Sequence, residues 1–314
     1  HVTLAELNSG TGRYEEAIRQ ARRAIDIDPG SYQAHSELAR ALDAIGRTDE
    51  AERTLKKAIA LQPNYWRSYV ELGTFYYNHD RNRDAEVAYR RVTELVPDNP
   101  TGYTDLAVIY HLEGRETEAE QMLKRSLQLR PTPQAYSNLA TIYFFQSRYA
   151  DAVPILEKLV ATGSKDYVVW ANLGDAYRWT PGEEHKAAQA YRTAMRLAGQ
   201  ALQVNALDAG ALMTVALCRV KLGEVAQAVA ALKKALATAR ADSNLLFNAA
   251  IVYELANKRA SAIKYLGMAI RAGYALNEVA AEPELRALRL DPRYATIQRS
   301  SSDLKPNAHL SKEK

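Results

Sequence analysis

Few polar residues of this chain have the types and spacing that catalysis or metal binding would need. Glu183, Glu184 and His185 are consecutive and offer a metal-binding pair, although polar residues that open a helix are typical of a solvated N-terminus. Gly10-Thr11-Gly12 resembles a phosphate loop but does not follow a strand. The HExxH pair, the Cys-x-x-Cys pair and the Walker loop are absent, and Ser, His and Asp lack the spacing of a hydrolase motif. We therefore predict no enzyme activity, no metal site and no cofactor.

The charge and hydropathy of the chain exclude two further classes of protein. Its 41 Lys and Arg residues are interspersed with 37 Asp and Glu residues, so the net charge is +4 over 314 residues and nucleic-acid binding is not predicted. No apolar run reaches the roughly 20 residues that a membrane span needs.

Cys218 is the single cysteine, which excludes an intrachain disulfide. Its apolar helical position predicts a buried, inert thiol, with a reactive thiol as the alternative.

The sequence leaves the compartment open, because one cysteine does not identify the redox environment. The chain opens at His1 rather than at a methionine, and its first residues do not resemble a signal peptide. We expect it to be an excised or processed portion of a longer protein. The cytoplasm is the first expectation for its location, and the periplasm and the cell exterior remain alternatives.

The elements that position any functional residues follow a repeat of about 34 residues. Four prolines keep this step, at Pro29, Pro63, Pro97 and Pro131. Eight alanines mark successive repeats, at Ala17, Ala51, Ala85, Ala119, Ala152, Ala187, Ala228 and Ala262. The steps between these alanines are 34, 34, 34, 33, 35, 41 and 34 residues. A fixed period of this size is typical of a solenoid, whose repeats contact only their neighbours.

Within a repeat, the apolar spacing predicts two helices. In the second repeat, Leu38, Leu42 and Ile45 recur at helical spacing until Gly46 breaks the pattern. A second apolar series starts at Ala51, continues through Leu55 and Ile59, and stops before Pro63, which cannot continue a helix. Each repeat is therefore a helix, a tight turn and an antiparallel helix. The small alanines suit the positions where the two helices approach most closely.

This pattern resembles the tetratricopeptide repeat family. The third repeat carries the resemblance through Tyr69, Leu72, Gly73, Tyr76, Ala85, Tyr89 and Pro97, and the sixth through Trp170, Leu173, Gly174, Tyr177, Ala187 and Tyr191. The resemblance implies an all-α, right-handed superhelical solenoid of about eight helix-turn-helix repeats with a C-terminal capping helix. We place the repeats near residues 1–29, 30–63, 64–97, 98–131, 132–164, 165–205, 206–240 and 241–274.

The chain departs from the regular period in two places. The step of 41 residues between Ala187 and Ala228 predicts a second helix that runs from about Glu184 towards Asn205, which either changes the superhelical pitch or forms a hinge or docking ledge. Residues 276–298 are similar to the closing helices of bacterial arrays attached to signalling kinases and regulators, and we expect them to cap the array. Residues 299–314 lose all periodicity and predict a disordered tail.

In this family the first helices line a concave groove, and the resemblance assigns one groove-facing position to each repeat. These positions are Glu37, Glu71, Asp105, Asn138, Asn172, Thr214 and Asn248. The three acids predict a negative stripe that favours a basic flank of a partner. The asparagines are similar to the asparagine ladder of the O-linked N-acetylglucosamine transferase repeat domain, which holds peptide backbones. Thr214 interrupts this ladder, and the alternative is that the amides bond neighbouring helix termini.

Aromatic residues close to the ends of the first helices complete the candidate site. They are Tyr77, Phe144, Phe145 and Trp179, with Arg178 beside the last. Exposed aromatics and arginine are typical of binding hot spots, although such rings can also pack under the turns between repeats. We predict a non-catalytic scaffold that binds a protein or an extended peptide in the groove. The alternatives are a regulatory or sensory part of a larger bacterial signalling enzyme or transcription regulator, and a structural protein that self-associates head to tail.

Overall fold

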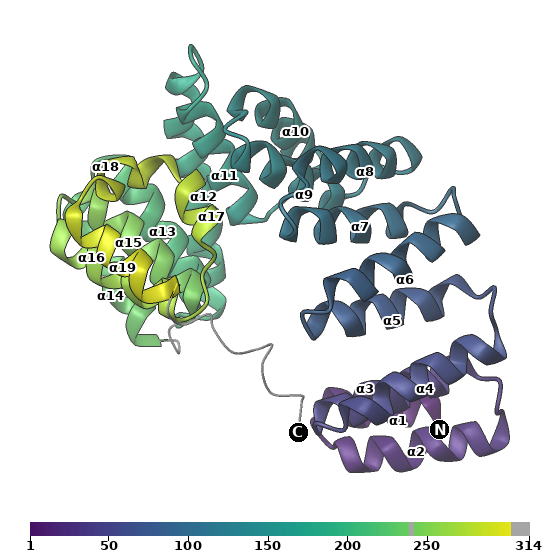
Figure 1. The fold of residues 1–314 in the computed structure, drawn as a ribbon. Helices are drawn as coiled ribbons and strands as arrows, with labels where there is room; N and C mark the ends of the chain where they lie inside the picture. Colours follow the sequence, from purple (N-terminus) through teal and green to yellow (C-terminus); the bar gives the residue numbers. More distant parts are fainter. Residues whose placement is uncertain (239–241, 303–314) are drawn as a thin grey trace. The chain divides into compact units, whose positions relative to one another are not determined.

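The computed structural model describes residues 1–238 and 242–302, with side chains up to residue 298, and its helices form two compact units (Figure 1). The N-terminal unit covers His1–Asn138 and the C-terminal unit begins at Leu139, inside α9 (Pro133–Phe145). The helices of the N-terminal unit before α9 are α1 (Val2–Gly10), α2 (Tyr14–Ile27), α3 (Tyr32–Ala44), α4 (Thr48–Leu61), α5 (Trp66–Asn78), α6 (Asn82–Leu95), α7 (Pro100–Leu112) and α8 (Glu116–Leu129).

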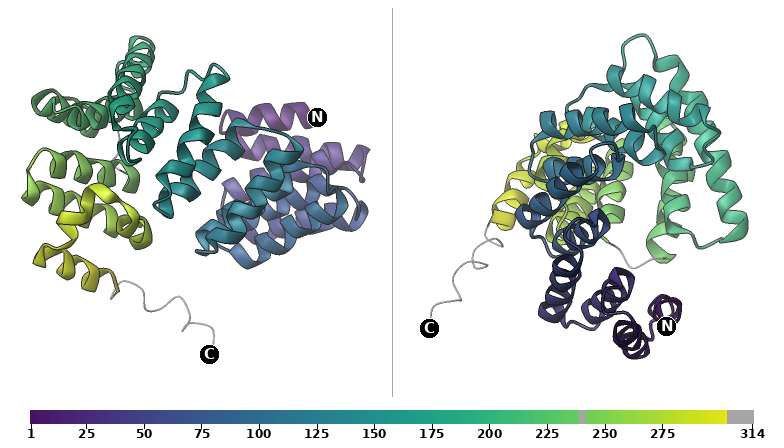
Figure 2. Two further views of the ribbon diagram at one scale, coloured as in Figure 1. Left: turned by 90° about the horizontal axis from the view of Figure 1, so that it is seen from above. Right: turned by 90° about the vertical axis from the view of Figure 1, so that its right-hand side faces the viewer.

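The C-terminal unit continues the same alternation and ends in short helices. Its paired helices after α9 are α10 (Tyr149–Ala161), α11 (Tyr167–Arg178), α12 (Glu184–Val204), α13 (Ala209–Lys221), α14 (Val225–Thr238), α15 (Ser243–Leu255) and α16 (Arg259–Arg271). The closing elements are α17 (Leu276–Ala281), the 3₁₀ helix η1 (Pro283–Leu285), α18 (Arg286–Arg289) and α19 (Pro292–Ser302). Within each unit, consecutive helices lie side by side and antiparallel (Figure 2).

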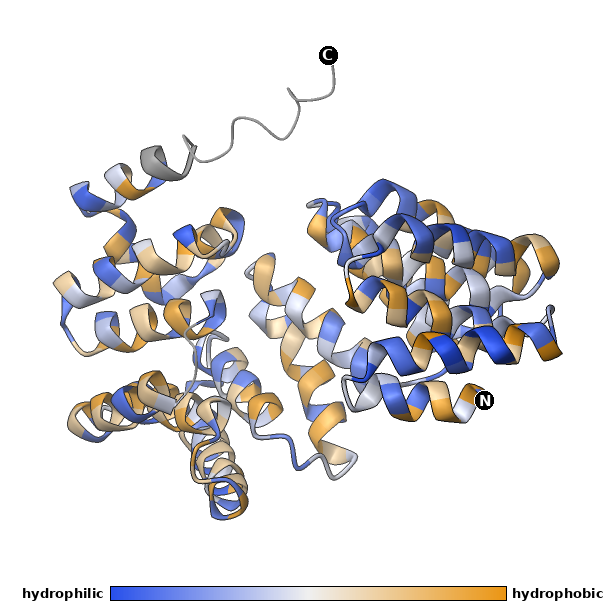
Figure 3. Cartoon of the chain, turned by 90° about the horizontal axis from the view of Figure 1, so that it is seen from below, coloured by the Kyte–Doolittle hydropathy of each residue, from blue (hydrophilic) through white to orange (hydrophobic). Residues whose placement is uncertain are grey.

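The predicted all-α solenoid of helix pairs is confirmed, and the part of the chain that the structure describes contains helices and no strand. Eight pairs, from α1–α2 to α15–α16, precede the closing helices. Hydrophobic and hydrophilic residues alternate around most of these helices (Figure 3). None of them is long and apolar enough to cross a membrane, as far as the described residues extend.

The close approach of paired helices depends on small residues. Seven of the eight repeat alanines are completely buried, and Ala187 is 5% exposed. Gly174 of α11 faces the ring of Tyr191 on α12, and a Cβ added at Gly174 would lie 2.5 Å from that ring. Gly73 and Tyr89 repeat this relation between α5 and α6. The glycines therefore leave space for a tyrosine of the partner helix, which explains why the sequence pattern pairs a glycine with a tyrosine.

Each turn between the two helices of a pair contains one residue in the left-handed backbone conformation. Gly46 supplies it between α3 and α4 with φ of 81°, and Asp80, Ser147 and Asn257 supply it in three other pairs with φ between 56° and 57°. In every pair except α11–α12, the N–H of the next residue then bonds a carbonyl of the last turn of the first helix, as Arg47 N does to Leu42 O at 2.9 Å. This is a Schellman-type helix end, in which glycine is preferred but short polar residues are tolerated.

The long second helix of the sixth repeat is confirmed, because α12 extends from Glu184 to Val204. The closing helices cover the end of the array. Val279, Leu285 and Leu288 are completely buried in a core that also contains residues of α13, α14, α15 and α16. The predicted cap is thus formed by α17 to α19. The predicted disordered tail lies outside the described residues from position 303 onward, and α19 includes its first four positions.

Candidate functional site

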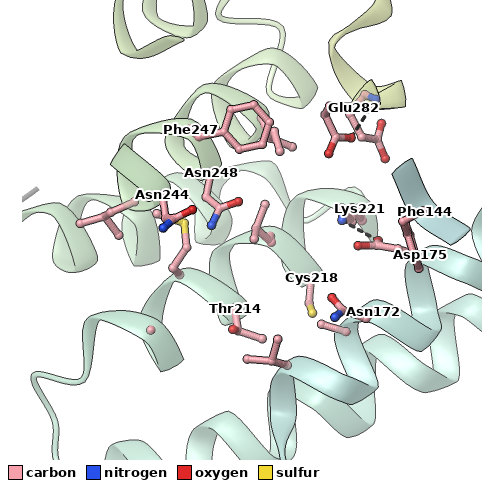
Figure 4. A pocket seen from close by; sticks show the side chains of 18 of the residues that line it. Phe144, Asn172, Asp175, Thr214, Cys218, Lys221, Asn244, Phe247, Asn248 and Glu282 are labelled. Carbon is pink, nitrogen blue, oxygen red and sulfur yellow. Dashed lines mark hydrogen bonds and ion pairs between the residues drawn. The ribbon is translucent and has the colours of Figure 1, made fainter. Parts of the chain in front are cut away.

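The C-terminal unit contains a cavity of about 520 Å³ on the face made by its first helices (Figure 4). Phe144 of α9, Asn172 of α11, Thr214 of α13 and Asn248 of α15 line it. The cap lines it too, through the segment from Glu282 to Glu284. We call this cavity the groove pocket. Four successive repeats and the cap therefore contribute to a single binding-sized space.

Amide side chains occupy equivalent positions in the groove pocket. Asn172 and Asn248 occupy the groove-facing position of their repeats, Thr214 occupies it in the repeat between them, and Asn244 lies one turn before Asn248 on α15. None of the three asparagine amides is hydrogen-bonded to another side chain or backbone group within the described chain. Each amide offers both a donor and an acceptor, so this row can bond a peptide backbone.

A charged cluster lies at the side of the groove pocket (Figure 4). Lys221 of α13 is almost completely buried, and its Nζ lies 2.5 Å from Oδ1 of Asp175 on α11. Tyr191 donates its hydroxyl hydrogen to the same oxygen at 2.7 Å. Burial alone would lower the pKa of Lys221, but the carboxylate of Asp175 outweighs it and holds this pKa above its usual value. Lys221 is therefore a buried ammonium already paired inside the protein.

The cap brings two more carboxylates to this cluster. Glu284 Oε1 lies 3.1 Å from Nε of Arg178 on α11, and the Glu284 side chain is only 6% exposed. Glu282 accepts a hydrogen bond from the backbone N–H of Glu284 at 3.1 Å. Burial raises the pKa of Glu282, and the charges of Asp175 and Glu284 add to the effect, although Lys221 partly offsets it.

Aromatic rings form the apolar walls. Phe144 meets Tyr149 edge to face at a centroid distance of 5.3 Å, and Tyr149 lies 6.1 Å from the partly exposed ring of Trp179. At another wall, Phe247 stacks on Tyr274 with centroids 4.0 Å apart. Such rings supply apolar contact area in fixed orientations.

Several predicted site residues meet in this pocket. Phe144, Asn172, Trp179 and Asn248 line it, and Arg178 lies at its edge through its ion pair with Glu284. Phe145 is half-buried and does not line it, so Phe144 is the ring of this pair that does. Cys218 also lines the pocket but is 1% exposed, as predicted for a buried thiol, and burial raises its pKa to about 12.

Residues that the sequence analysis missed complete the cluster. Asp175 follows Asn172 by three positions, and Asn244 precedes Asn248 by four, so helical spacing places each pair on one face. The helical spacing in the sequence could therefore have identified Asp175 and Asn244. Glu282, Glu284 and Lys221 had no comparable local signal, because their position depends on how the cap folds against α11 and α13.

The predicted acidic stripe of the N-terminal unit requires correction. Glu37 is buried, at 3% exposure, and forms an ion pair with Arg40 three residues later. Burial raises the pKa of Asp105 to about 7, so its carboxyl group is only partly charged near neutral pH. Glu71 and Tyr77 are exposed as expected. An exposed stripe of three carboxylates is therefore not formed, because the first is buried and paired and the last is desolvated.

Asn138 is the last residue of the N-terminal unit and does not line the groove pocket. Its side-chain oxygen accepts a hydrogen bond from Gln134 Nε2 at 2.7 Å, one turn earlier on α9. Its amide nitrogen is buried without a hydrogen-bond partner among the described residues. Across the described side chains there is no group of three or more His, Cys, Asp or Glu residues that could hold a metal ion.

Comparison with solved structures shows the same fold. A chain of the APC/C hetero-tetramer Cut9–Hcn1 has 18% identity and a TM-score of 0.56; the match covers 85% of the present chain and 48% of that chain. A tetratricopeptide repeat protein from Parabacteroides merdae has 14% identity and a TM-score of 0.54, with 90% and 95% of the two chains covered. The human IFIT1 dimer with m7Gppp-AAAA has 18% identity and a TM-score of 0.57, with 96% and 74% covered. At these identities the likeness shows the fold alone.

Sequence comparison identifies the family. No curated protein matches the chain. Three family models, each described as a tetratricopeptide repeat, match residues 10–72, 70–135 and 134–163. They cover the first helix pairs without a gap, and the later pairs continue the same helix-turn-helix alternation. The chain is a tetratricopeptide repeat protein.

Proposed function

We propose that the groove pocket binds an extended peptide segment of a partner protein and that the chain acts as a non-catalytic interaction scaffold. The tetratricopeptide repeat fold is in general a scaffold for protein–protein interaction. The observation that carries the proposal is the row of Asn172, Thr214 and Asn248 along one cavity, in which the two asparagine amides bond no other described group. An extended peptide presents alternating donors and acceptors to such a row.

The physical properties of the pocket support this ligand class. Its volume of about 520 Å³ is within the usual range for ligand sites, which is about 300–1,000 Å³. Phe144 and Trp179 offer apolar contact beside the amides. Each hydrogen bond to a neutral peptide group contributes about 1 kcal/mol, so several repeats must act together, and we expect micromolar affinity.

Selection from a phage-displayed library of random dodecapeptides tests the proposal. The enriched peptides are synthesised with a fluorescent label and titrated by anisotropy against three chains: wild type, the Asn172→Ala/Asn248→Ala double variant and Asn64→Ala. Asn64 is an exposed amide of the N-terminal unit and serves as the matched control. Circular dichroism checks that all three chains keep their helices.

The double variant loses two hydrogen-bonding side chains, so its affinity is expected to fall about thirtyfold, whereas Asn64→Ala keeps wild-type affinity. Equal affinity in the double variant and the wild type would place peptide binding outside the groove pocket. Failure to select any peptide that binds the wild-type chain would also contradict the proposal.

A further inference from the structure

We infer that the peptide bound in the groove pocket presents a lysine or arginine side chain, which Glu282 receives. This inference rests on the proposed function and adds the chemistry of the partner. Its basis is the charge balance of the pocket, where four carboxylates, Asp175, Asp242, Glu282 and Glu284, face two cations, Lys221 in the lining and Arg178 at the edge. A pocket with excess negative charge favours a cationic ligand group.

The cations at the pocket are already committed to partners inside the protein. Lys221 is paired with Asp175 at 2.5 Å, and Arg178 is paired with Glu284 at 3.1 Å. A carboxylate of an acidic peptide would have to break one of these buried pairs, and a charge left without its partner is costly to bury. The two internal pairs therefore select against acidic ligands.

Glu282 is the carboxylate that remains at the charged side of the pocket. Its carboxylate forms no ion pair with any residue in the described chain, and the one hydrogen bond that this carboxylate accepts there comes from the backbone N–H of Glu284. Asp242, the other lining carboxylate without an ion pair to a described residue, is occupied as the N-cap of α15, where it accepts the N–H of Leu245 at 2.7 Å. Burial that raises the pKa of Glu282 indicates that its charge is poorly solvated, so a cation brought by a ligand would stabilise it.

The walls beside Glu282 suit the long stem of a basic side chain. Phe247 and Tyr274, stacked on each other, line the same pocket as Glu282. In the view of Figure 4, Phe247 and Glu282 lie along the upper side of the pocket, Asn248 lies just below Phe247, and Asn172 lies at the lower side. Lysine and arginine cover apolar surface with their methylene groups and place the charged end in a polar site. A peptide that bonds the asparagines can therefore send one basic side chain towards Glu282.

The test compares the peptides that the full chain selects with those that Glu282→Gln selects, from the same random dodecapeptide library. Glutamine keeps an oxygen that can accept the Glu284 N–H and removes the charge. Glu6→Gln is the matched control, because Glu6 is exposed in the N-terminal unit and the change in net charge is the same. The best wild-type peptide and its Lys→Gln or Arg→Gln derivative are then titrated against each chain by anisotropy.

We expect wild-type and Glu6→Gln selections enriched in one basic position, and at least tenfold weaker binding when that residue becomes glutamine. Glu282→Gln is expected to bind both peptides with similar affinity. Selected peptides without a basic position, or an equal basic preference in Glu282→Gln, would overturn this inference while leaving the proposed peptide binding intact. Sedimentation velocity on the same samples tests whether a second copy of the chain occupies the groove pocket. A dimer that Phe144→Ala abolishes would show that it does, and this result would also overturn the inference.

Discussion

Arg178 on α11 and Glu284 on η1 form an ion pair of 3.1 Å that joins the sixth repeat to the C-terminal cap. The two residues are far apart in sequence, and their pairing makes the cap one wall of the groove pocket. A capping segment thus has a second role here, because it covers the apolar end of the array and also supplies carboxylates to the candidate site.

The first prediction concerns this pair. Arg178→Ala leaves the Glu284 carboxylate buried without its partner, so we expect the cap to be destabilised by about 1–3 kcal/mol. Glu284→Gln removes the buried charge itself and is expected to cost less. Hydrogen exchange of the amides in α17 and α18 measures the effect, since a weaker cap opens more often. Equal exchange in wild type and Arg178→Ala would show that the pair does not hold the cap.

The second prediction compares two helical glycines of the C-terminal unit. Gly174→Ala places a methyl group 2.5 Å from the ring of Tyr191, so we expect a loss of about 1–3 kcal/mol despite the better helix propensity of alanine. Gly199→Ala in α12 meets no atom within 4 Å and is expected to stabilise by about 0.5–1 kcal/mol. Thermal unfolding by circular dichroism separates the two. A stabilising Gly174→Ala would contradict the close approach of α11 to Tyr191 of α12.

The third prediction is a pH dependence that comes from Asp105. In the folded chain Asp105 keeps its proton up to about pH 7, whereas an unfolded aspartate loses it near pH 4. The folded state therefore binds more protons between these values, and stability falls as the pH rises from about 4 to about 7. We expect a loss on the order of 1–3 kcal/mol over this range, measured by urea unfolding.

The control for this pH dependence is in the same unit. Asp105→Asn is expected to remove this contribution and to be more stable than the wild type at pH 8. Glu71→Gln changes the exposed carboxylate at the equivalent position of the preceding repeat, and it should leave the contribution in place. A wild-type profile that matches that of Asp105→Asn would contradict the burial of an uncharged Asp105.

The fourth prediction concerns the reactivity of the thiol. Burial raises the pKa of Cys218 to about 12, so its thiolate fraction at pH 8 is about a thousandfold lower than that of an exposed cysteine. We expect alkylation by iodoacetamide to be slow in the folded chain and fast in denaturant. A cysteine introduced at the exposed Val204, in a Cys218→Ser background, provides the fast reference in the folded state. Comparable rates at the two positions would contradict the burial of Cys218.

The repeat period made the helix pairs predictable from the sequence. Equivalent positions in successive repeats also identified part of the candidate site. Because each repeat has the same geometry, a position that faces the groove in one repeat faces it in the next, and this placed Asn172 and Asn248 on one cavity. The period of the prolines and alanines likewise gave the helix pairs and the long α12.

Repetition could not predict what neighbouring side chains do to a charge. Glu37 is at the groove-facing position, yet it is buried and paired with Arg40, and Asp105 is desolvated by its surroundings. Nor could it predict Glu282 and Glu284, since the cap lies outside the repeat and reaches α11 only through tertiary folding. The charged half of the candidate site therefore required the structure.

Photo-crosslinking gives a direct test of peptide binding in the groove pocket. Benzoylphenylalanine replaces Phe144 in one chain and the exposed Val87 of α6 in another, and each is irradiated with the best selected peptide before mass spectrometry. We expect a covalent peptide adduct at position 144 and none at position 87. An adduct at position 87 with none at position 144 would contradict peptide binding in the groove pocket.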